Sequence, residues 1–331
     1  MSDLAAILRP YEGDVPGAAL LVVRAGEPVV RRGWGLADLE ARVAVTPATN
    51  FRLASLTKAF TAAAVLILAE EGRLALDDAA RTWLPSLPAT ASAITLRHLL
   101  NHTSGLIDYE AVMPAATREP LRDADVLRLL EAQDRTYFPP GKDYRYSNGG
   151  YALLALVVSR ASGEGFARFL EDRIFAPLGM QGSVAHEAGV SSIRHRAFGY
   201  SSQGGRWIRT DQDLTSAVLG DGGIYSSIED LAKWDAALQE PGLLSAESLR
   251  LAFTHATATD AADVHYGCGW RITGETVWHS GETIGFRNVI VRWPRRRCSV
   301  ILLTNRDDPP PYGYALAIAK LLFRGEHERA S

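Results

Sequence analysis

Apolar residues gather at both ends of the chain in short runs that are typical of β-strands. Near the N-terminus, residues 18–23 and 28–35 are two such runs, and Ala25-Gly26-Glu27 between them predicts a hairpin. Near the C-terminus, turns that contain glycine or proline separate four further predicted strands. These strands cover residues 267–272, 276–279, 286–293 and 299–304.

The middle of the chain has the spacing of apolar positions that predicts helices. The strongest pattern covers residues 55–71, and Gly72 follows it at the position where glycine commonly ends a helix. Further helices are predicted at residues 121–132, 149–162, 165–174 and 228–238, and a closing helix at residues 314–323.

Together these elements predict an α+β fold. A pair of strands is only marginally stable alone, so the two ends of the chain are expected to combine into one antiparallel sheet flanked by helices. We therefore expect a single domain of two lobes, an α/β lobe of residues 1–72 with 220–331 and an inserted, mainly helical lobe of residues 73–219. A cleft between two lobes is a favoured place for a small-molecule site.

Composition narrows the classes of partner. The 331 residues are 47% hydrophobic and 22% charged with a formal net charge of -3, which gives no electrostatic signal for nucleic acid or anionic lipid. The one basic cluster, at Arg292 and residues 295–297, is expected to be a solvated turn. No apolar run reaches the roughly 18 residues of a membrane span.

Two features bear on the compartment. Residues 1–10 lack the basic and apolar regions of a signal peptide. Cys268 and Cys298 lie in apolar, strand-like stretches, and one pair of half-buried thiols suits a reducing environment. The expected location is therefore the cytoplasm. No glycine motif of a nucleotide-binding loop follows a strand, so no cofactor is expected.

The first candidate for chemistry is Ser55 with Lys58. At helical spacing i and i+3 their side chains share one face, so the hydroxyl and the amine can meet. A serine hydroxyl needs a base within hydrogen-bond reach, and a lysine can serve once desolvation disfavours its ammonium form. Alone, this spacing is far more often that of a capping serine and a surface lysine. The alanine- and leucine-rich run after Lys58 favours a buried helix, in which an unused lysine is costly.

The second candidate is Tyr146-Ser147-Asn148, after a loop stiffened by proline and glycine. In an extended segment Tyr146 and Asn148 would face the same side. A phenol held near an amine can transfer protons, and an amide can bind a substrate carbonyl. The structural alternative is a turn in which Asn148 caps the helix that begins at Gly149.

The third candidate is His279-Ser280-Gly281-Glu282, at the end of a predicted strand. Gly281 permits close approach of another backbone, which a substrate site at a strand edge requires. A histidine at a strand end with ordinary hydrogen bonds is the simpler explanation for His279 taken by itself.

In this order, the three segments resemble the serine β-lactamase and penicillin-binding-protein superfamily, whose signature includes S-x-x-K. The Y-x-N and H-x-G forms look like its class C branch, which includes DD-peptidases, D-aminopeptidases and family VIII carboxylesterases. The similarity covers nearly the whole chain and includes residues 96–106, 220–227 and 302–305. The resemblance implies a β-lactamase/transpeptidase-like fold.

The resemblance also implies roles. Ser55 would be acylated, Lys58 would take or relay its proton, and Tyr146 would act as general acid/base. Asn148 would orient the substrate, and the backbone N–H groups of Ser55 and Glu282 would form an oxyanion hole. The implied activity is a serine hydrolase that uses an acyl-enzyme on a small ester, amide or peptide, with no metal and no cofactor.

One departure and two alternatives remain. His279 stands where a lysine would supply a fixed cation for a β-lactam carboxylate, so an uncharged ester or a peptide is the more plausible substrate. His98 and His102, at i and i+4, resemble a zinc pair but have no convincing third ligand. The alternative function is a catalytically weak penicillin-binding, sensor or filament-forming protein.

Overall fold

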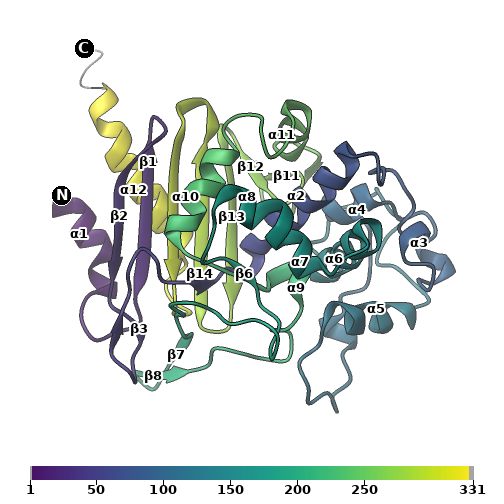
Figure 1. Ribbon diagram of the computed structural model, residues 1–331, viewed down its shortest axis with the longest axis horizontal. Coiled ribbons are helices and arrows are strands. Elements are labelled where there is room, and N and C mark those ends of the chain that lie inside the picture. The colour runs from purple at the N-terminus through teal and green to yellow at the C-terminus, as the bar shows by residue number, and fades with distance from the viewer. Residues whose placement is uncertain (1, 328–331) are drawn as a thin grey trace.

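The computed structural model describes residues 2–327 and is built on one eight-stranded antiparallel sheet with the order β10-β11-β12-β13-β14-β15-β1-β2. Two strands come from the start of the chain and six from its end, as Figure 1 shows by their colours. The strands are β1 (Ala18–Arg24), β2 (Glu27–Trp34), β10 (Thr257–Ala258), β11 (His265–Tyr266), β12 (Arg271–Thr273), β13 (Thr276–Thr283), β14 (Phe286–Trp293) and β15 (Cys298–Thr304).

The pairing of β1 with β15 joins the two ends of the chain. Ala18 lies opposite Thr304 and Val23 opposite Ser299, which confirms the prediction of one combined sheet. Both faces of this sheet are covered. Leu20 of β1 packs in one hydrophobic cluster and Leu21 in the other. Strands buried on two faces have continuous apolar runs, and this explains the sequence pattern at both ends.

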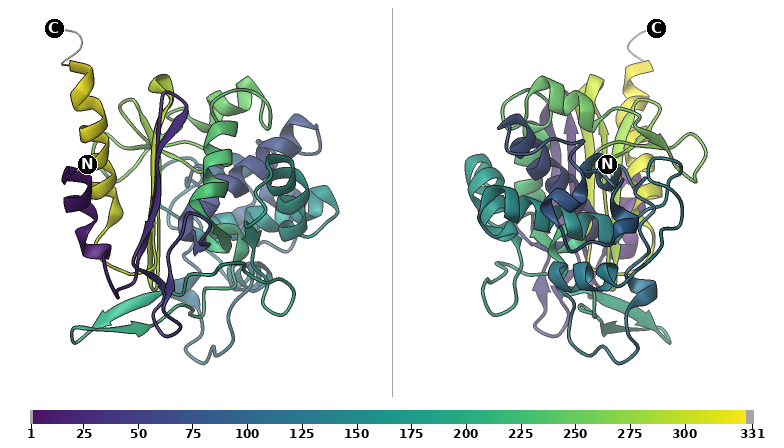
Figure 2. Two further views of the ribbon diagram at one scale, coloured as in Figure 1. Left: turned by 60° about the vertical axis from the view of Figure 1, so that its left-hand side comes forward. Right: turned by 90° about the vertical axis from the view of Figure 1, so that its right-hand side faces the viewer.

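The helices form a layer on each face of the sheet. The first and last helices, α1 and α12, pack side by side on one face, and the remaining helices lie on the opposite side (Figure 2, left). The helices are α1 (Ser2–Leu8), α2 (Thr57–Glu70), α3 (Ala80–Trp83), α4 (Leu96–Leu100), α5 (Asp123–Glu131), α6 (Asn148–Ser162), α7 (Phe166–Leu170), α8 (Ala176–Leu178), α9 (Leu219–Gly222), α10 (Ile228–Ala237), α11 (Ala246–Ala252) and α12 (Pro311–His327).

Three small sheets complete the described part of the chain. The one next to the candidate site has the order β5-β9-β6, and its central strand pairs with Phe51 and Arg52, just before Ser55. None of the helices within residues 2–327 has the length and apolar character to cross a bilayer. The short strands are β3 (Leu36–Asp38), β4 (Val43–Ala44), β5 (Phe51–Arg52), β6 (Val184–Ala185), β7 (Tyr200–Gln203), β8 (Arg206–Arg209) and β9 (Ile224–Ser226).

Several predicted elements are wrong in their extent, among them the closing helix, which covers Pro311–His327; two of the differences have a clear local form. The strand expected at residues 267–272 begins only at Arg271. The chain first bends at Gly269, which has φ +77° and lies so close to α2 that a Cβ there would be 2.7 Å from the Lys58 carbonyl oxygen. The helix expected at residues 165–174 changes at Glu171 into a π-helical turn, which ends at Phe175.

The expectation that Arg292 belongs to a solvated turn is also wrong. Its side chain is 0% exposed, and its Nε donates to Asp235 Oδ1 at 2.6 Å. Ser299 donates to the same carboxylate oxygen at 2.7 Å. Arg292 therefore pins α10 to the sheet through a buried ion pair, whereas Arg295 to Arg297 stand in the turn itself.

Candidate active site

Ser55 lies in a single 3-10 turn, η2 (Ala54–Leu56), between strand β5 and helix α2. The residue before it, Ala54, has φ +50°, a left-handed conformation that non-glycine residues adopt at a cost of about 1–3 kcal/mol and that clusters at functional sites. Two contacts hold this turn: Leu53 N donates to Ile224 O, and Asn288 Nδ2 donates to Arg52 O at 2.8 Å.

Lys58 is the buried centre of the site. Its side chain is 0% exposed, and α2 is buried from Thr57 to Leu68, as its apolar sequence predicts. Nζ donates to Ser55 Oγ at 3.0 Å, to Asn148 Oδ1 at 2.9 Å and to the backbone oxygen of Asp221 at 3.0 Å. An ammonium has three donors, so these three acceptors fix its orientation.

In the second motif, Tyr146-Ser147-Asn148, the residue that caps helix α6 is Ser147 and not the expected Asn148. Ser147 caps α6 by accepting from Gly150 N at 3.1 Å, whereas Asn148 is the first residue of the helix. The alternative that Asn148 is the cap is therefore wrong, and so is an extended conformation through Asn148. Because its side chain is free of capping, Asn148 reaches Lys58 with its oxygen and Glu110 Oε1 with its nitrogen, at 2.9 Å.

The Tyr146 phenol ring also lies close to Lys58. The centre of the ring is 4.9 Å from Lys58 Nζ. The ring packs against His102, with centroids 4.3 Å apart. His102 is fully buried with φ +61°, and its Nδ1 accepts from Ser147 N at 3.1 Å. Burial lowers the pKa of His102 well below its usual value, so the ring is neutral and serves as packing beneath Tyr146.

The positions of His98 and His102 do not suit the zinc pair that their spacing resembles. His98 lies in α4, where its Nδ1 accepts from Thr95 N in the helix cap, and His102 follows the helix and faces Tyr146. Within residues 2–327, no group of three or more His, Cys, Asp or Glu side chains is arranged to hold a metal ion. The segment that contains both histidines is therefore a scaffold for the second motif.

The third motif runs along β13, which continues to Thr283 instead of ending at His279. A Cβ at Gly281 would lie 2.0 Å from Leu53 O, so only glycine allows β13 to pass this close to the Ser55 turn. Ser280 is half-buried beside Gly281, and Glu282 is exposed at the mouth of the cavity described below.

The side chain of His279 is buried away from that cavity. Its Nδ1 donates to Ser280 O at 2.6 Å, and its Nε2 lies 3.0 Å from Tyr266 Oη. Burial, with the Arg271 and Lys58 charges nearby, lowers the pKa of His279 well below its usual value. A neutral ring then accepts from Tyr266, and this agrees with the expectation that this position supplies no cation.

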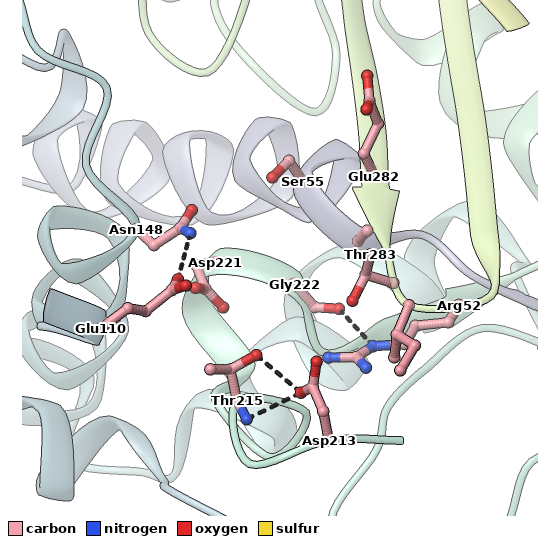
Figure 3. A pocket seen from close by; sticks show the side chains of 12 residues that line it. Arg52, Ser55, Glu110, Asn148, Asp213, Thr215, Asp221, Gly222, Glu282 and Thr283 are labelled. Carbon is pink, nitrogen blue, oxygen red and sulfur yellow. Dashed lines mark hydrogen bonds between the residues drawn. The ribbon is translucent and has the colours of Figure 1, made fainter. Parts of the chain in front are cut away.

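A cavity of about 230 Å³ opens next to Ser55, and several of its walls were not predicted (Figure 3). Arg52, Glu110, Asp213 and Asp221 line it together with Ser55, Asn148 and Glu282. Arg52 ends strand β5, Glu110 begins a 3-10 turn and Asp213 lies in a loop, and no local motif marks these three residues. Asp221 stood within a segment that the resemblance had singled out, between Gly220 and Gly222, but no chemistry was assigned to it.

Asp221 is the most perturbed of these carboxyls. It is 8% exposed, and burial raises its pKa to about 7. The Lys58 charge opposes this rise, whereas Asp123 adds to it. Asp123 is also buried, and its carboxylate accepts from Leu219 N and Gly220 N, both at 3.0 Å. Asp123 thereby holds α9 in the position from which Asp221 O meets Lys58.

The Beta-lactamase family description matches residues 4–324. The chain belongs to this family. It is 31% identical over 316 residues to penicillin-binding protein 4* of Bacillus subtilis, with 90% of this chain and 70% of that protein covered. It is 28% identical to protein flp of Staphylococcus aureus strain MW2, with 89% of this chain aligned, and it spans only about 60% of that protein's length.

Among solved structures, this β-lactamase-family chain is similar to the D-amino acid amidase of Ochrobactrum anthropi SV3 in complex with L-phenylalanine amide. The TM-score is 0.83 and the identity 25%, over 99% of both chains. The predicted superfamily and fold are thereby confirmed. Membership identifies the chain as a serine hydrolase of the β-lactamase fold, a class that acts on ester or amide bonds.

Proposed function

We propose that the chain hydrolyses ester or amide bonds through an acyl-enzyme formed on Ser55. One observation carries this proposal: Ser55 Oγ faces the cavity and lies 3.0 Å from the Nζ of a lysine that is closed off from solvent. A hydroxyl beside an amine in a site that excludes water is the arrangement that activates a serine nucleophile.

In the proposed reaction, Lys58 acts as its neutral amine: Ser55 Oγ attacks the substrate carbonyl carbon, and its proton passes to Lys58 Nζ, from which Tyr146 relays it. That proton is delivered to the leaving oxygen or nitrogen as the C–O or C–N bond breaks. Asn148 orients the carbonyl side of the substrate, and the backbone N–H groups of Ser55 and Glu282 bind the oxyanion. Water then attacks the acyl carbon, Ser55 Oγ regains a proton, and the acid leaves.

The experiment is hydrolysis of p-nitrophenyl butyrate together with labelling by a fluorophosphonate. Wild type is expected to turn the ester over and to carry one adduct on Ser55 by mass spectrometry. Ser55→Ala should lose both, and Ser92→Ala, at an exposed serine, should keep both. Equal activity in Ser55→Ala and wild type would show that the nucleophile is misassigned.

A second candidate, a penicillin-binding or sensor protein of slow turnover, is favoured by one observation. The Arg271 guanidinium carbon lies 5.5 Å from the centre of the Tyr146 ring, so a cation stands on the Tyr146 side of the site even though His279 is neutral. A cation there suits the carboxylate of a penicillin. Incubation with penicillin separates the two functions. A lasting penicilloyl adduct on Ser55 without ester turnover supports the sensor, and rapid ester turnover without such an adduct supports the hydrolase.

A further inference from the structure

Tyr266 lies outside the three motifs but at the point where the second and third motifs meet. It belongs to β11, and its side chain is 0% exposed. Its ring packs edge-on against His102, with centroids 4.5 Å apart, and also faces Tyr146 edge-on at 6.4 Å. Its Oη lies 3.0 Å from His279 Nε2. The hydroxyl therefore ends on the histidine of the third motif, although the proposed reaction gives it no part.

The contacts of His279 leave one arrangement of its ring protons. A carbonyl oxygen only accepts hydrogen bonds, so the 2.6 Å contact with Ser280 O requires a proton on Nδ1. Burial lowers the pKa of His279, so the neutral ring carries one proton and its Nε2 must accept from Tyr266 Oη. In a neutral imidazole, the hydrogen bond made by one nitrogen decides whether the other is protonated. The Tyr266 hydroxyl thus selects the tautomer that binds Ser280 O.

The carbonyl that His279 binds lies on a critical edge of β13. Strand residues two positions apart direct their backbone groups to the same edge, so Ser280 O shares an edge with the Glu282 N–H that is assigned to the oxyanion hole. β12 pairs with β13 only as far as Trp278. Beyond that residue the edge has no strand of residues 2–327 to hold it, and the His279 ring supplies a hydrogen bond there instead.

A change of tautomer would disturb this edge. With the proton on Nε2, the Nδ1 lone pair would face the lone pairs of Ser280 O at 2.6 Å, and the two groups would repel each other. The peptide between Ser280 and Gly281 would then move, and it directly precedes the peptide that carries the Glu282 N–H. Displacement of about 1 Å at a reacting group typically costs about 10² in rate.

We propose that Tyr266 is a positioning residue for the oxyanion hole: its hydroxyl keeps His279 in the Nδ1–H tautomer, which fixes the Ser280 carbonyl and with it the Glu282 N–H. This assignment rests on the proposed function, because it requires that the Glu282 N–H binds the oxyanion of the Ser55 adduct. Tyr266 is not among the residues that line the cavity, so it acts through His279.

The tautomer can be measured directly by long-range proton–nitrogen NMR spectra of the full chain labelled in its histidines. The His279 signals are those that His279→Gln removes, and in wild type they should show the Nδ1–H pattern. Tyr266→Phe should lose that pattern. Tyr11→Phe should retain it, because Tyr11 is also 0% exposed and its hydroxyl has no hydrogen-bond partner in the described part of the chain. An Nε2–H pattern in wild type would overturn the assignment.

The kinetic test uses p-nitrophenyl butyrate. Phenylalanine keeps the ring contacts with His102 and Tyr146, so the variant loses only the hydroxyl. The oxyanion forms only as the reaction proceeds, so Tyr266→Phe should lower kcat by about 10–10² and keep KM within about threefold of wild type. Tyr11→Phe should keep both constants. A wild-type kcat in Tyr266→Phe, or a change in KM alone, would overturn the assignment.

A double-mutant cycle with His279→Gln tests whether the effect passes through the tautomer. A glutamine amide keeps its N–H groups whatever its neighbours, so in the His279→Gln background Tyr266→Phe should change kcat by less than about threefold. A fall as large as that in the wild-type background would show that Tyr266 acts by another route, and would overturn the assignment.

Two outcomes of the experiment need separate readouts. If Tyr266→Phe does not fold, the wild-type spectrum still decides the tautomer on which the assignment depends. Absence of ester turnover in wild type would refute the proposed hydrolysis, whereas the tautomer is measured without substrate. The rate of fluorophosphonate labelling at Ser55 then replaces kcat, because that adduct also places an oxygen in the oxyanion hole, and an equal rate in wild type and Tyr266→Phe would overturn the assignment.

Discussion

Lys58 determines how the neighbouring polar residues are arranged. Because its ammonium is fully buried, each of its donors needs an acceptor, and the three acceptors come from the Ser55 turn, from α6 and from α9. A change at any of these segments therefore alters the orientation of the amine toward Ser55. The same logic applies to Asn148, whose two amide atoms connect Lys58 with Glu110.

Tyr146→Phe tests the proposed proton transfer, because it removes only the phenol hydroxyl. The ring packing on His102 is retained while the hydroxyl is lost, so kcat/KM for p-nitrophenyl butyrate should fall by about 10²–10⁴, the usual contribution of general acid–base catalysis. Tyr137→Phe, at an exposed tyrosine, should leave the rate unchanged. A wild-type rate in Tyr146→Phe would assign the proton transfer to Lys58 alone.

Single residues also show what the sequence could and could not predict. Ser55 and Lys58 were predictable because helical spacing brings i and i+3 together and the apolar run after Lys58 indicates burial. Arg292 was misplaced because its partner, Asp235, lies 57 positions away on α10. Asp221 was missed as a chemical group because a polar residue between glycines is typical of an exposed turn, and only the tertiary fold buries it.

Among the elements, the close contact between β13 and the Ser55 turn has the most direct consequence for the site. It depends on Gly281, whose missing side chain leaves room for Leu53 O. The sequence indicated the need for glycine but ended the strand at His279, since nothing local shows that Glu282 and Thr283 still pair with β14. Helix α6 was predicted to within a residue, yet its cap is Ser147, one position before the expected Asn148.

Gly281→Ala should separate β13 from the Ser55 turn. The added Cβ would lie 2.0 Å from Leu53 O, so one backbone must shift, and displacement of about 1 Å at a reacting group typically costs about 10² in rate. The expected result is a fall of that size in kcat/KM for p-nitrophenyl butyrate. Gly313→Ala, at an exposed position of α12 with nothing within 4 Å of the new methyl, should retain full activity. Full activity in Gly281→Ala would show that this contact does not position the nucleophile.

For the whole molecule, the combined sheet explains why the site forms only in the complete fold. β1 pairs with β15 across nearly the full length of the chain, and the cavity walls come from positions 52, 110, 213, 221 and 282. The sheet was predictable, because short strands at each end cannot be stable alone. The grouping of Glu110, Asp213, Asp221 and Glu282 around the cavity was not, since these residues lie on segments far apart in the chain that meet only in the complete fold.

Burial of two carboxyls makes global stability depend on pH. The pKa of Asp221 rises to about 7 and that of Asp123 to about 6, from 3.8 in the unfolded chain. Between about pH 4 and pH 7 the folded state therefore binds more protons than the unfolded state. The contribution of these groups to the free energy of unfolding must then fall as pH rises through that window, and it stays low above it. Lys58 and Arg52 reduce the effect at Asp221, whereas Glu110 and Asp123 increase it.

Asp221→Asn isolates this contribution, because the amide has no proton to lose. The free energy of unfolding is measured by urea denaturation at pH 5 and pH 8. From pH 5 to pH 8 it should fall by about 1–3 kcal/mol less in the variant than in wild type. Asp134→Asn, exposed to solvent, should follow wild type at both values. If the difference between Asp221→Asn and wild type were the same at pH 5 and pH 8, the carboxyl would titrate as it does in the unfolded chain.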